Sequence, residues 1–200
     1  MSKEWLKRRK RDSYYKKAKR EGYRSRAAYK LKEINNRVKL IKPGSRVLDV
    51  GASPGGWSQV AMEIVGDRGK VVAVDITPMQ PIDGVVFIQG NIEHDDVVER
   101  ILEESDRYDA VISDAAPKLS GNKTLDRGRS YALCYFALKL SLKVLRDGGD
   151  CLVKIFQGDE MDELKDDFAD HFGSVDHFKP KSSVKRSIEL YLLFRNFKGS

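Results

Sequence analysis

Four charged residues lie in segments whose other residues are mainly apolar, and they are the positions best suited to chemistry. Lys154 and Glu189 interrupt runs rich in Leu, Val and Ile, Asp114 ends a third such run, and Lys30 falls inside an apolar pattern with helical spacing. Charged side chains are almost never fully buried unless they are paired. We therefore expect the fold to bring these two cations and two anions together, an arrangement suited to proton transfer beside a cleft.

The elements that must position these residues alternate along the chain. A helical pattern begins at Ser25, a potential cap, and ends near Lys42. The expected strands are 46–50, 70–75, 85–88, 108–113 and 150–156, and the expected helices between them are 56–65, 94–105, 131–145 and 159–171. Near-continuous Val and Ile strands separated by helices predict a parallel sheet covered on both faces. A closing pair of strands near 174–178 and 188–195 shares a short basic loop, so we expect it to be antiparallel.

A glycine-rich turn follows the first strand and opens the first helix of this alternating region. Its glycines, Gly51, Gly55 and Gly56, let a ligand approach the backbone closely. Asp75 ends the next strand, where it can accept hydrogen bonds from ribose hydroxyls, and Asn91 follows the third strand, where it can read an adenine edge. This pattern fits any adenosine-containing cofactor. The turn lacks the middle glycine that admits a pyrophosphate in dinucleotide sites, which favours S-adenosylmethionine over NAD.

The charge of the chain is concentrated at its N-terminus. Residues 1–42 hold 17 Lys and Arg against four Asp and Glu, a net +13, so the remainder carries −6 of the total of +7. Such a segment predicts a polyanionic partner, although a merely solubilising tail is the alternative. Tyrosines interleave with these charges and can stack on unpaired bases, which favours nucleic acid over a membrane surface; they are Tyr14, Tyr15, Tyr23 and Tyr29.

Length and composition indicate one domain of an intracellular protein. We expect a basic N-terminal arm over 1–22 and a single catalytic domain over 23–198, monomeric and cytoplasmic. No apolar run reaches the ~18 residues that a membrane helix needs. The two cysteines, Cys134 and Cys151, lie in apolar surroundings and are expected to be buried free thiols. Neither they nor the three scattered histidines have ligand spacing, so no metal site is predicted.

Five ordered motifs carry a family resemblance. They are 22–34 (GYRSRAAYKLKEI), 48–59 (LDVGASPGGWSQ), 113–117 (SDAAP), 152–157 (LVKIFQ) and 179–191 (KPKSSVKRSIELY). From about residue 20 to 196 the chain resembles the FtsJ/RrmJ family of large-subunit ribosomal RNA ribose 2′-O-methyltransferases. The resemblance implies a Rossmann-like S-adenosylmethionine-dependent methyltransferase fold, with a mostly parallel seven-stranded sheet, an antiparallel last strand and helices on both faces.

The resemblance also implies roles for individual residues. The family's catalytic tetrad falls on Lys30, Asp114, Lys154 and Glu189. Its cofactor contacts fall on Gly55, Trp57, Asp75, the Asn91 position and Asp114; bacterial members carry Asp where this chain has Asn91, and either side chain can accept from the adenine amino group.

The chemistry of the tetrad can be argued from the residues themselves. Methyl transfer to a ribose hydroxyl needs orientation, removal of the hydroxyl proton and exclusion of water. A cation beside a lysine disfavours its protonation, so Lys30 near Lys154 would favour the neutral amine. We hypothesise that Lys154 steers and deprotonates the 2′-hydroxyl with Asp114 beside it, while Lys30 and Glu189 position the ribose.

Basic residues that flank the tetrad in the sequence are expected to contact phosphates, which sets affinity without reading sequence. They are Arg24, Arg26, Lys179, Lys181, Lys185 and Arg186.

The expected activity is S-adenosylmethionine-dependent 2′-O-methylation of a uridine in 23S ribosomal RNA, within the large ribosomal subunit. Two alternatives stay open: a transfer-RNA anticodon-loop ribose 2′-O-methyltransferase, and a non-catalytic RNA-binding ribosome assembly factor.

Overall fold

The protein folds as a single mixed sheet between two layers of helices. A computed structural model describes residues 13–184 and 187–199. The elements are α2 (Ser13–Arg20), α3 (Ala28–Val38), β1 (Arg46–Val50), α4 (Gly56–Val65), β2 (Lys70–Asp75), β3 (Val85–Gln89), α5 (Asp95–Glu104), β4 (Tyr108–Ser113), α6 (Lys123–Val144), β5 (Leu145–Phe156), α7 (Glu160–Ala169), β6 (Phe172–Phe178) and β7 (Glu189–Phe197).

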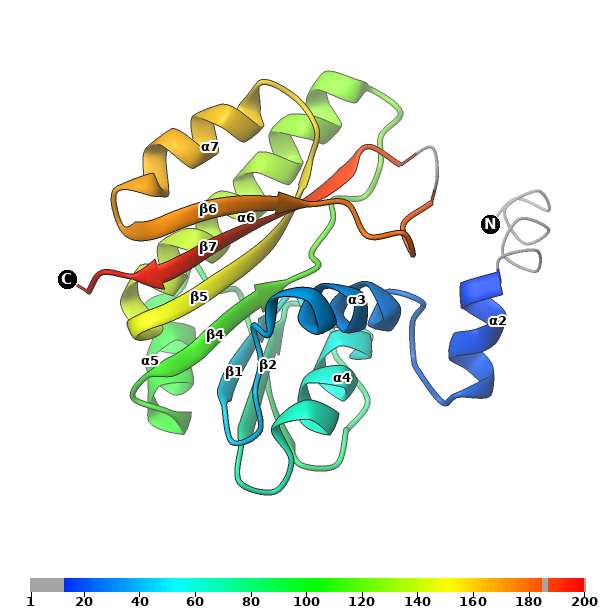
Figure 1. Ribbon diagram of the computed structural model, residues 1–200, viewed down its shortest axis with the longest axis vertical. Helices are drawn as coiled ribbons and strands as arrows, with labels where there is room; N and C mark the ends of the chain where they lie inside the picture. Colours follow the sequence, from blue (N-terminus) through cyan, green and yellow to red (C-terminus); the bar gives the residue numbers. More distant parts are fainter. Residues whose placement is uncertain (1–12, 185–186, 200) are drawn as a thin grey trace.

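The sheet has seven strands in the order β3-β2-β1-β4-β5-β7-β6. The pairs among β1 to β5 are parallel, whereas β7 is antiparallel to both β5 and β6. Figure 1 shows α3 and α4 in front of the sheet and α5 and α6 behind it. The predicted fold class is therefore confirmed, including the antiparallel last strand and helices on both faces.

Alternation along the central strands supplies both hydrophobic layers. Val47 and Leu152 pack with α3 and α4, whereas their strand neighbours Leu48 and Val153 pack with α5, α6 and α7. Because the inner strands are buried on both faces, they are apolar at nearly every position. Lys154 is two residues beyond Leu152, so its side chain belongs to the α3 and α4 face, and the sheet brings it toward Lys30.

The largest departures from the predicted boundaries are the starts of α6 and β5, and both lie at polar segments. Helix α6 begins at Lys123, eight residues before the predicted start, because the Asn122 side chain accepts from the Leu125 N–H (3.2 Å) and caps a polar first turn. Strand β5 begins at Leu145 and not at the predicted residue 150. The glycines that were expected to end α6 belong to the strand instead, in an irregular part where its register against β4 shifts. Ser25 is likewise not the cap of α3, whose N-cap is Ala27 with no side-chain hydrogen bond.

The described part of the predicted N-terminal arm is helical and packs against the domain. Ala18 of α2 is buried, and the ring of Tyr14 lies 5.5 Å from that of Tyr29. Tyr29 is itself buried and donates its hydroxyl to Glu21, while Tyr23 donates to Glu63. Tyr29 is therefore not available to stack on a base, contrary to the expectation from sequence. The more N-terminal part of the predicted arm lies outside the described residues.

Two expectations about the interior can be checked directly. Cys134 and Cys151 are buried free thiols, as predicted. Within residues 13–184 and 187–199, no helix combines the length and the apolar character required to cross a membrane.

Candidate active site

The four charged residues singled out in the sequence meet at the carboxyl edge of the sheet. Lys154 Nζ lies 3.0 Å from Asp114 Oδ1 and donates to the Asp114 carbonyl oxygen at 2.7 Å. Lys30 Nζ donates to Glu189 Oε2 at 2.9 Å and lies 3.9 Å from Asp114 Oδ1. Lys154 Nζ and Glu189 Oε1 are 4.0 Å apart. The two ammonium groups thus share two carboxylates.

Four different elements deliver these side chains. Asp114 follows β4, Lys154 lies in β5, Glu189 opens β7 and Lys30 lies in α3. The β5–β7 register sets Lys154 opposite Tyr191 and Phe156 opposite Glu189. Lys154 is only 5% exposed and Lys30 only 7%, so both depend on their ion partners for stability in the folded chain.

The charges in this cluster stabilise one another. Burial disfavours the charged form of Glu189, but the ammonium groups of Lys30 and then Lys154 outweigh it and hold its pKa below the ordinary value of 4.5. Glu189 is therefore an anion at neutral pH, and the cluster as a whole contains compensating charges.

Tyr191 is a member of this cluster that sequence reasoning missed. Its hydroxyl donates to Asp114 Oδ1 at 2.6 Å, and its ring stacks on Trp57 with centroids 5.7 Å apart. Burial, and then the charge of Asp114, raise the pKa of Tyr191 well above 10, so it remains a donor. Its position two residues after Glu189, on the same face of β7, was the only available signal, because a tyrosine in an apolar strand otherwise resembles a core residue.

The glycine turn lies directly beside the cluster. A Cβ atom on Gly51 would approach the Cβ of Ala115, the residue after Asp114, to 2.6 Å. Gly55 has φ +106°, in the left-handed region that favours glycine, and a Cβ there would lie 2.6 Å from Ile82 Cδ1. Gly56 begins α4, whose first N–H groups have no partner within the helix. The turn therefore packs closely against the residue after Asp114 and leads directly into a helix N-terminus.

Two polar side chains extend this site along the edge of the sheet. Asp75 accepts from the N–H groups of Ser53 (2.8 Å) and Thr77 (2.7 Å), so the carboxylate is fixed beside the turn. Asn91 Oδ1 accepts from the Glu93 N–H at 3.1 Å. The spacing of a glycine turn, a fixed carboxylate and an amide at successive strand ends fits a nucleoside bearing a charged tail.

Trp57 contributes to this region differently from what its motif suggests. Its indole is buried and donates to the Ala27 carbonyl oxygen at 2.9 Å. The main-chain N–H of Trp57 lies in the first turn of α4, directly after the glycine turn. A cofactor contact from Trp57 remains a prediction, and it would come from the backbone.

A buried acid beneath the turn was not singled out in the sequence. Asp49 is 1% exposed and accepts from the Ser58 hydroxyl at 2.6 Å. Burial raises its pKa to about 7; the Ser58 hydrogen bond opposes the shift, while the charges of Asp114 and Asp75 add to it. An acidic residue within the apolar run Val-Leu-Asp-Val was the sequence signal that could have indicated a buried carboxyl group.

The basic residues predicted to contact RNA occupy varied surroundings. The guanidinium of Arg24 donates to the carbonyl oxygens of Gln80 (2.5 Å), Pro81 (2.6 Å) and Pro54 (3.2 Å). Arg26 donates to the Ser182 carbonyl oxygen. Phosphate contacts by these two residues therefore remain a prediction, with backbone carbonyls as the partners in the structure.

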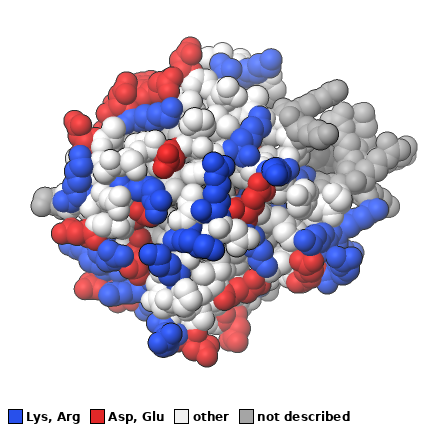
Figure 2. All heavy atoms as spheres, viewed as in Figure 1, with Lys and Arg blue, Asp and Glu red and all other residues white. Residues whose placement is uncertain are grey.

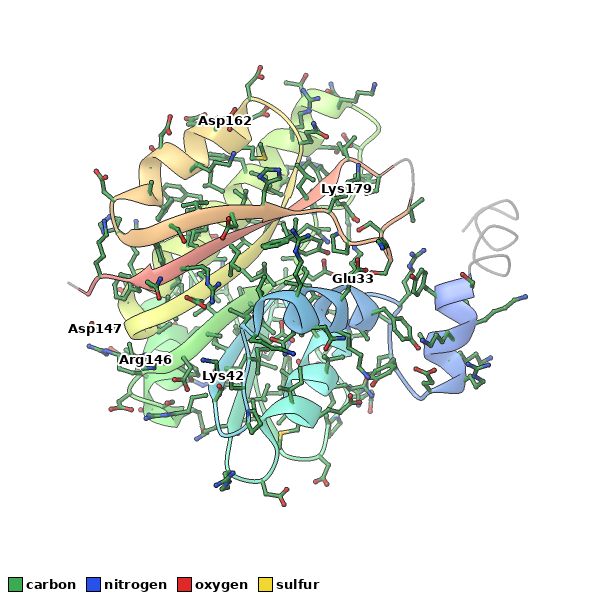
Figure 3. The ribbon with its side chains drawn as sticks, viewed as in Figure 1. Glu33, Lys42, Arg146, Asp147, Asp162 and Lys179 are labelled. Atoms are coloured by element: carbon green, nitrogen blue, oxygen red, sulfur yellow. The ribbon has the colours of Figure 1, made fainter. Side chains whose placement is uncertain are left out.

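The other predicted RNA contacts belong to the segment between β6 and β7. Lys179 and Lys181 are exposed, while Lys185 and Arg186 lie outside the described residues. Glu33 of α3 accepts from the N–H groups of Lys181 (2.7 Å) and Ser182 (3.1 Å), which holds this segment beside the cluster; Figure 3 labels Glu33 and Lys179 on this side of the molecule.

The surface in this view is mixed in charge. Figure 2 shows Lys and Arg side chains across its centre with acidic residues among them. Among residues 13–184 and 187–199, no three His, Cys, Asp or Glu side chains are grouped so that they could hold a metal ion.

Comparisons with known proteins agree on one family. Residues 23–197 match the profile of the family described as FtsJ-like methyltransferase. A protein from Pseudomonas paraeruginosa named ribosomal RNA large subunit methyltransferase E is 48% identical over 200 residues, covering 99% of this chain and 97% of its own. A crystal structure of a chain described as a ribosomal RNA methyltransferase, from Plasmodium falciparum, superposes with a TM-score of 0.78 at 34% identity, covering 89% of this chain and all of that one. Fibrillarin from Aeropyrum pernix, solved with S-adenosyl-L-methionine, shares the fold at 15% identity and a TM-score of 0.57, covering 78% of this chain and 68% of that one.

Proposed function

Because the chain belongs to the FtsJ-like methyltransferase family, we propose that it methylates the ribose 2′-hydroxyl of a uridine in the 23S RNA of the large ribosomal subunit. The observation that carries the proposal is the contact of Lys154 with Asp114 directly beside the glycine turn. The full-length similarity to a large-subunit ribosomal RNA methyltransferase supports the choice of substrate.

S-adenosyl-L-methionine is the cofactor, and it supplies an electrophilic methyl group. We assign its binding to the glycine turn, with Asp75 as acceptor for the ribose hydroxyls and Asn91 at the adenine edge. A Cβ at Gly51, Gly55 or Gly56 would meet Ala115, Ile82 or Ser25, so glycine at each position is what allows the turn to keep this shape. The main-chain N–H of Trp57 and the carboxylate of Asp114 complete this set.

Lys154 is the residue that we propose holds the 2′-hydroxyl and, as its neutral amine, accepts the hydroxyl proton while the oxygen takes the methyl group. Its Nζ contacts the Oδ1 and the carbonyl oxygen of Asp114. These two contacts fix the orientation of the amine, so the side of Nζ that faces the ribose is also fixed. Proton removal by a positioned group contributes typically ~10²–10⁴-fold to a rate. Lys30 and Glu189 form the second ion pair and would position the ribose, while Tyr191 fixes the orientation of Asp114.

The test of this assignment is the replacement of Lys154. Lys154→Ala, and Lys154→Met to retain volume, should reduce methyl transfer at least ~10²-fold while the Kd for S-adenosylmethionine changes little. Lys139→Ala, an exposed lysine of α6, serves as the matched control. Full activity of both Lys154 variants would refute the assignment, and the unfolding midpoint of each variant would exclude loss by misfolding.

The substrate is tested separately. Tritium transfer from labelled S-adenosylmethionine to large subunits, to naked 23S RNA and to transfer RNA should be strongest for the large subunit. Transfer only to transfer RNA would favour an anticodon-loop enzyme, and RNA binding without any transfer would favour an assembly factor.

The remaining organisation is part of the same proposal. The chain would act as a monomer in the cytoplasm, with residues 23–198 as the catalytic domain and 1–22 adding RNA affinity through its basic residues. Light scattering on the eluted protein tests the monomer, and a steeper fall of RNA affinity with salt for the full chain than for a chain lacking residues 1–12 tests the role of the N-terminus.

A further inference from the structure

A hollow opens at the carboxyl edge of the sheet, next to Glu189. Its volume is about 380 Å³, within the about 300–1,000 Å³ range of small-ligand pockets. It lies among α6, the turn between β5 and α7, and the residue before β7, and its lining includes Arg127, Gln157, Gly158, Asp159, Met161 and Ile188.

The hollow adjoins the proposed catalytic cluster through the strand ends. Phe156 and Glu189 form the last pair of the β5–β7 ladder, and the next N–H, that of Gln157, donates to the Ile188 carbonyl oxygen at 2.8 Å. Gln157 and Ile188 therefore lie one residue beyond Glu189, with side chains on the opposite face of the sheet from Lys154. A nucleotide next to a ribose held at Lys154 would reach this hollow across the end of the sheet.

The polar groups that line the hollow include one buried donor without a partner. Arg127 Nε is buried and has no hydrogen-bond partner among the described residues. Gly158 packs against this group, because a Cβ there would meet Glu160 Oε2 and would lie 3.2 Å from Arg127 Nε. Glu160 Oε2 is likewise buried without a hydrogen-bond partner among the described residues. A buried donor without a partner is costly, so a ligand acceptor at this point would be favoured.

The surrounding charges decide what kind of ligand fits. Asp159 and Asp162 also line the hollow, and Figure 3 labels Asp162 on α7. Two carboxylates repel a phosphate, whereas a nucleobase is neutral. The ring N–H of a base can donate to a carboxylate, and its carbonyl oxygens can accept from Arg127 and Gln157.

Apolar surface in and around the hollow supports a base as well. Ile188 is 41% exposed, and Met161, whose thioether makes favourable contacts with aromatic rings, lies in the same wall. Among the large apolar side chains that are exposed, Leu119 and Leu125 lie in the loop after β4 and the first turn of α6, and Val184 and Ile188 lie in the segment before β7. Exposed apolar side chains beside basic groups are typical of proteins that bind unstacked bases of RNA.

We propose that this hollow binds an unstacked base of the substrate RNA, that of a nucleotide flanking the methylated one. The proposal rests on the proposed function, since it takes the ribose at Lys154 as its reference point. Arg127 and Gln157 hydrogen-bond the edge of the base, and Ile188 contacts its face.

The first experiment separates a base from a phosphate. Filter binding to a 23S RNA transcript is measured across a salt series for Arg127→Ala, Gln157→Ala and the matched control Arg129→Ala, an exposed arginine two residues away on α6. Loss of one base contact should raise the Kd at least ~5-fold for both hollow variants, with the dependence of log Kd on log salt unchanged. A slope reduced by about 1 for Arg127→Ala identifies a phosphate contact and overturns the proposal, as does a Kd equal to that of the control.

The second experiment locates the base. RNA lacking the base on the 5′ or the 3′ side of the methylated nucleotide is bound to the wild type and to Gln157→Ala. If the hollow holds one of these two bases, removal of that base should weaken binding of the wild type but not of Gln157→Ala. At that position, the two changes together then weaken binding no more than either change alone. Additive losses at both positions overturn the proposal.

Failure of the proposed function can be distinguished from failure of the proposed base site. If the wild type methylates none of the ribosomal substrates, the proposed function fails. If it methylates 23S RNA and the hollow variants bind that RNA as tightly as Arg129→Ala does, only the base site is wrong. The Kd for S-adenosylmethionine should be unchanged in both hollow variants, because neither residue belongs to the glycine turn.

Discussion

Replacement of Arg24 should weaken cofactor binding more than RNA binding, although the sequence context of Arg24 predicts a phosphate contact. The guanidinium donates to the carbonyl oxygens of Gln80 and Pro81 on one side and of Pro54 on the other. It therefore joins the glycine turn to the segment that follows β2. Arg24 Nη1 is also among the atoms that a Cβ on Gly55 would approach, at 3.2 Å, so the guanidinium lies against the turn itself.

The size of the effect follows from these three bonds. Hydrogen bonds from charged donors are worth about 1.5–3 kcal/mol each when buried, and less where water competes, as it does here. If ~1.4–2.8 kcal/mol of that total fixes the turn in its binding conformation, Arg24→Ala weakens S-adenosylmethionine binding about 10- to 100-fold. Arg24→Lys keeps the charge but loses the fork of donors, so we expect an intermediate loss.

The assay is calorimetric titration of S-adenosylmethionine into each variant, paired with filter binding to RNA across a salt series. Lys181→Ala is the control, because the side chain of Lys181 is exposed and only its main-chain N–H bonds to Glu33. A cofactor Kd within twofold of the wild type for Arg24→Ala, together with a salt slope reduced by about 1, would show that Arg24 contacts phosphate and that this reasoning is wrong.

Three further predictions concern the residues that support the site. The pKa of Asp49 is raised from 3.8 to about 7 in the folded state, so the protonated carboxyl stabilises the fold at low pH and that stabilisation is lost as pH rises from about 4 to 7. Chemical denaturation across this pH range should show the loss in the wild type and not in Asp49→Asn. Tyr191→Phe removes a donor from the Asp114 carboxylate and should lower the free energy of unfolding by ~1–3 kcal/mol, measured by urea titration. Glu33→Gln weakens the acceptor for two N–H groups of the β6–β7 segment, at Lys181 and Ser182, and should raise the Kd for RNA with no change in the cofactor Kd; a changed cofactor Kd would contradict the separation of the two sites.

The ion cluster could be anticipated from the sequence because burial of an unpaired charge is so unfavourable. Lys154 in an apolar strand had to find anions, and Asp114 at the end of a neighbouring strand was the natural partner. Parallel strands place their carboxyl ends at one edge, which is why the glycine turn was expected there as well. The alternation of Val-rich strands with helices likewise predicted the order of the elements, and the short loop between the last two strands predicted their antiparallel pairing.

Tertiary structure alone decided the partners that depend on register and on loops distant in sequence. Tyr191 looks like a core aromatic until the β5–β7 pairing brings its hydroxyl to Asp114, 77 residues away. Arg24 looks like a phosphate ligand until the segment 56 residues later presents its carbonyl oxygens. Local spacing reports which face of a strand or helix a residue occupies, whereas a hydrogen-bond partner depends on where another part of the chain is packed, and that is fixed only when the whole core forms.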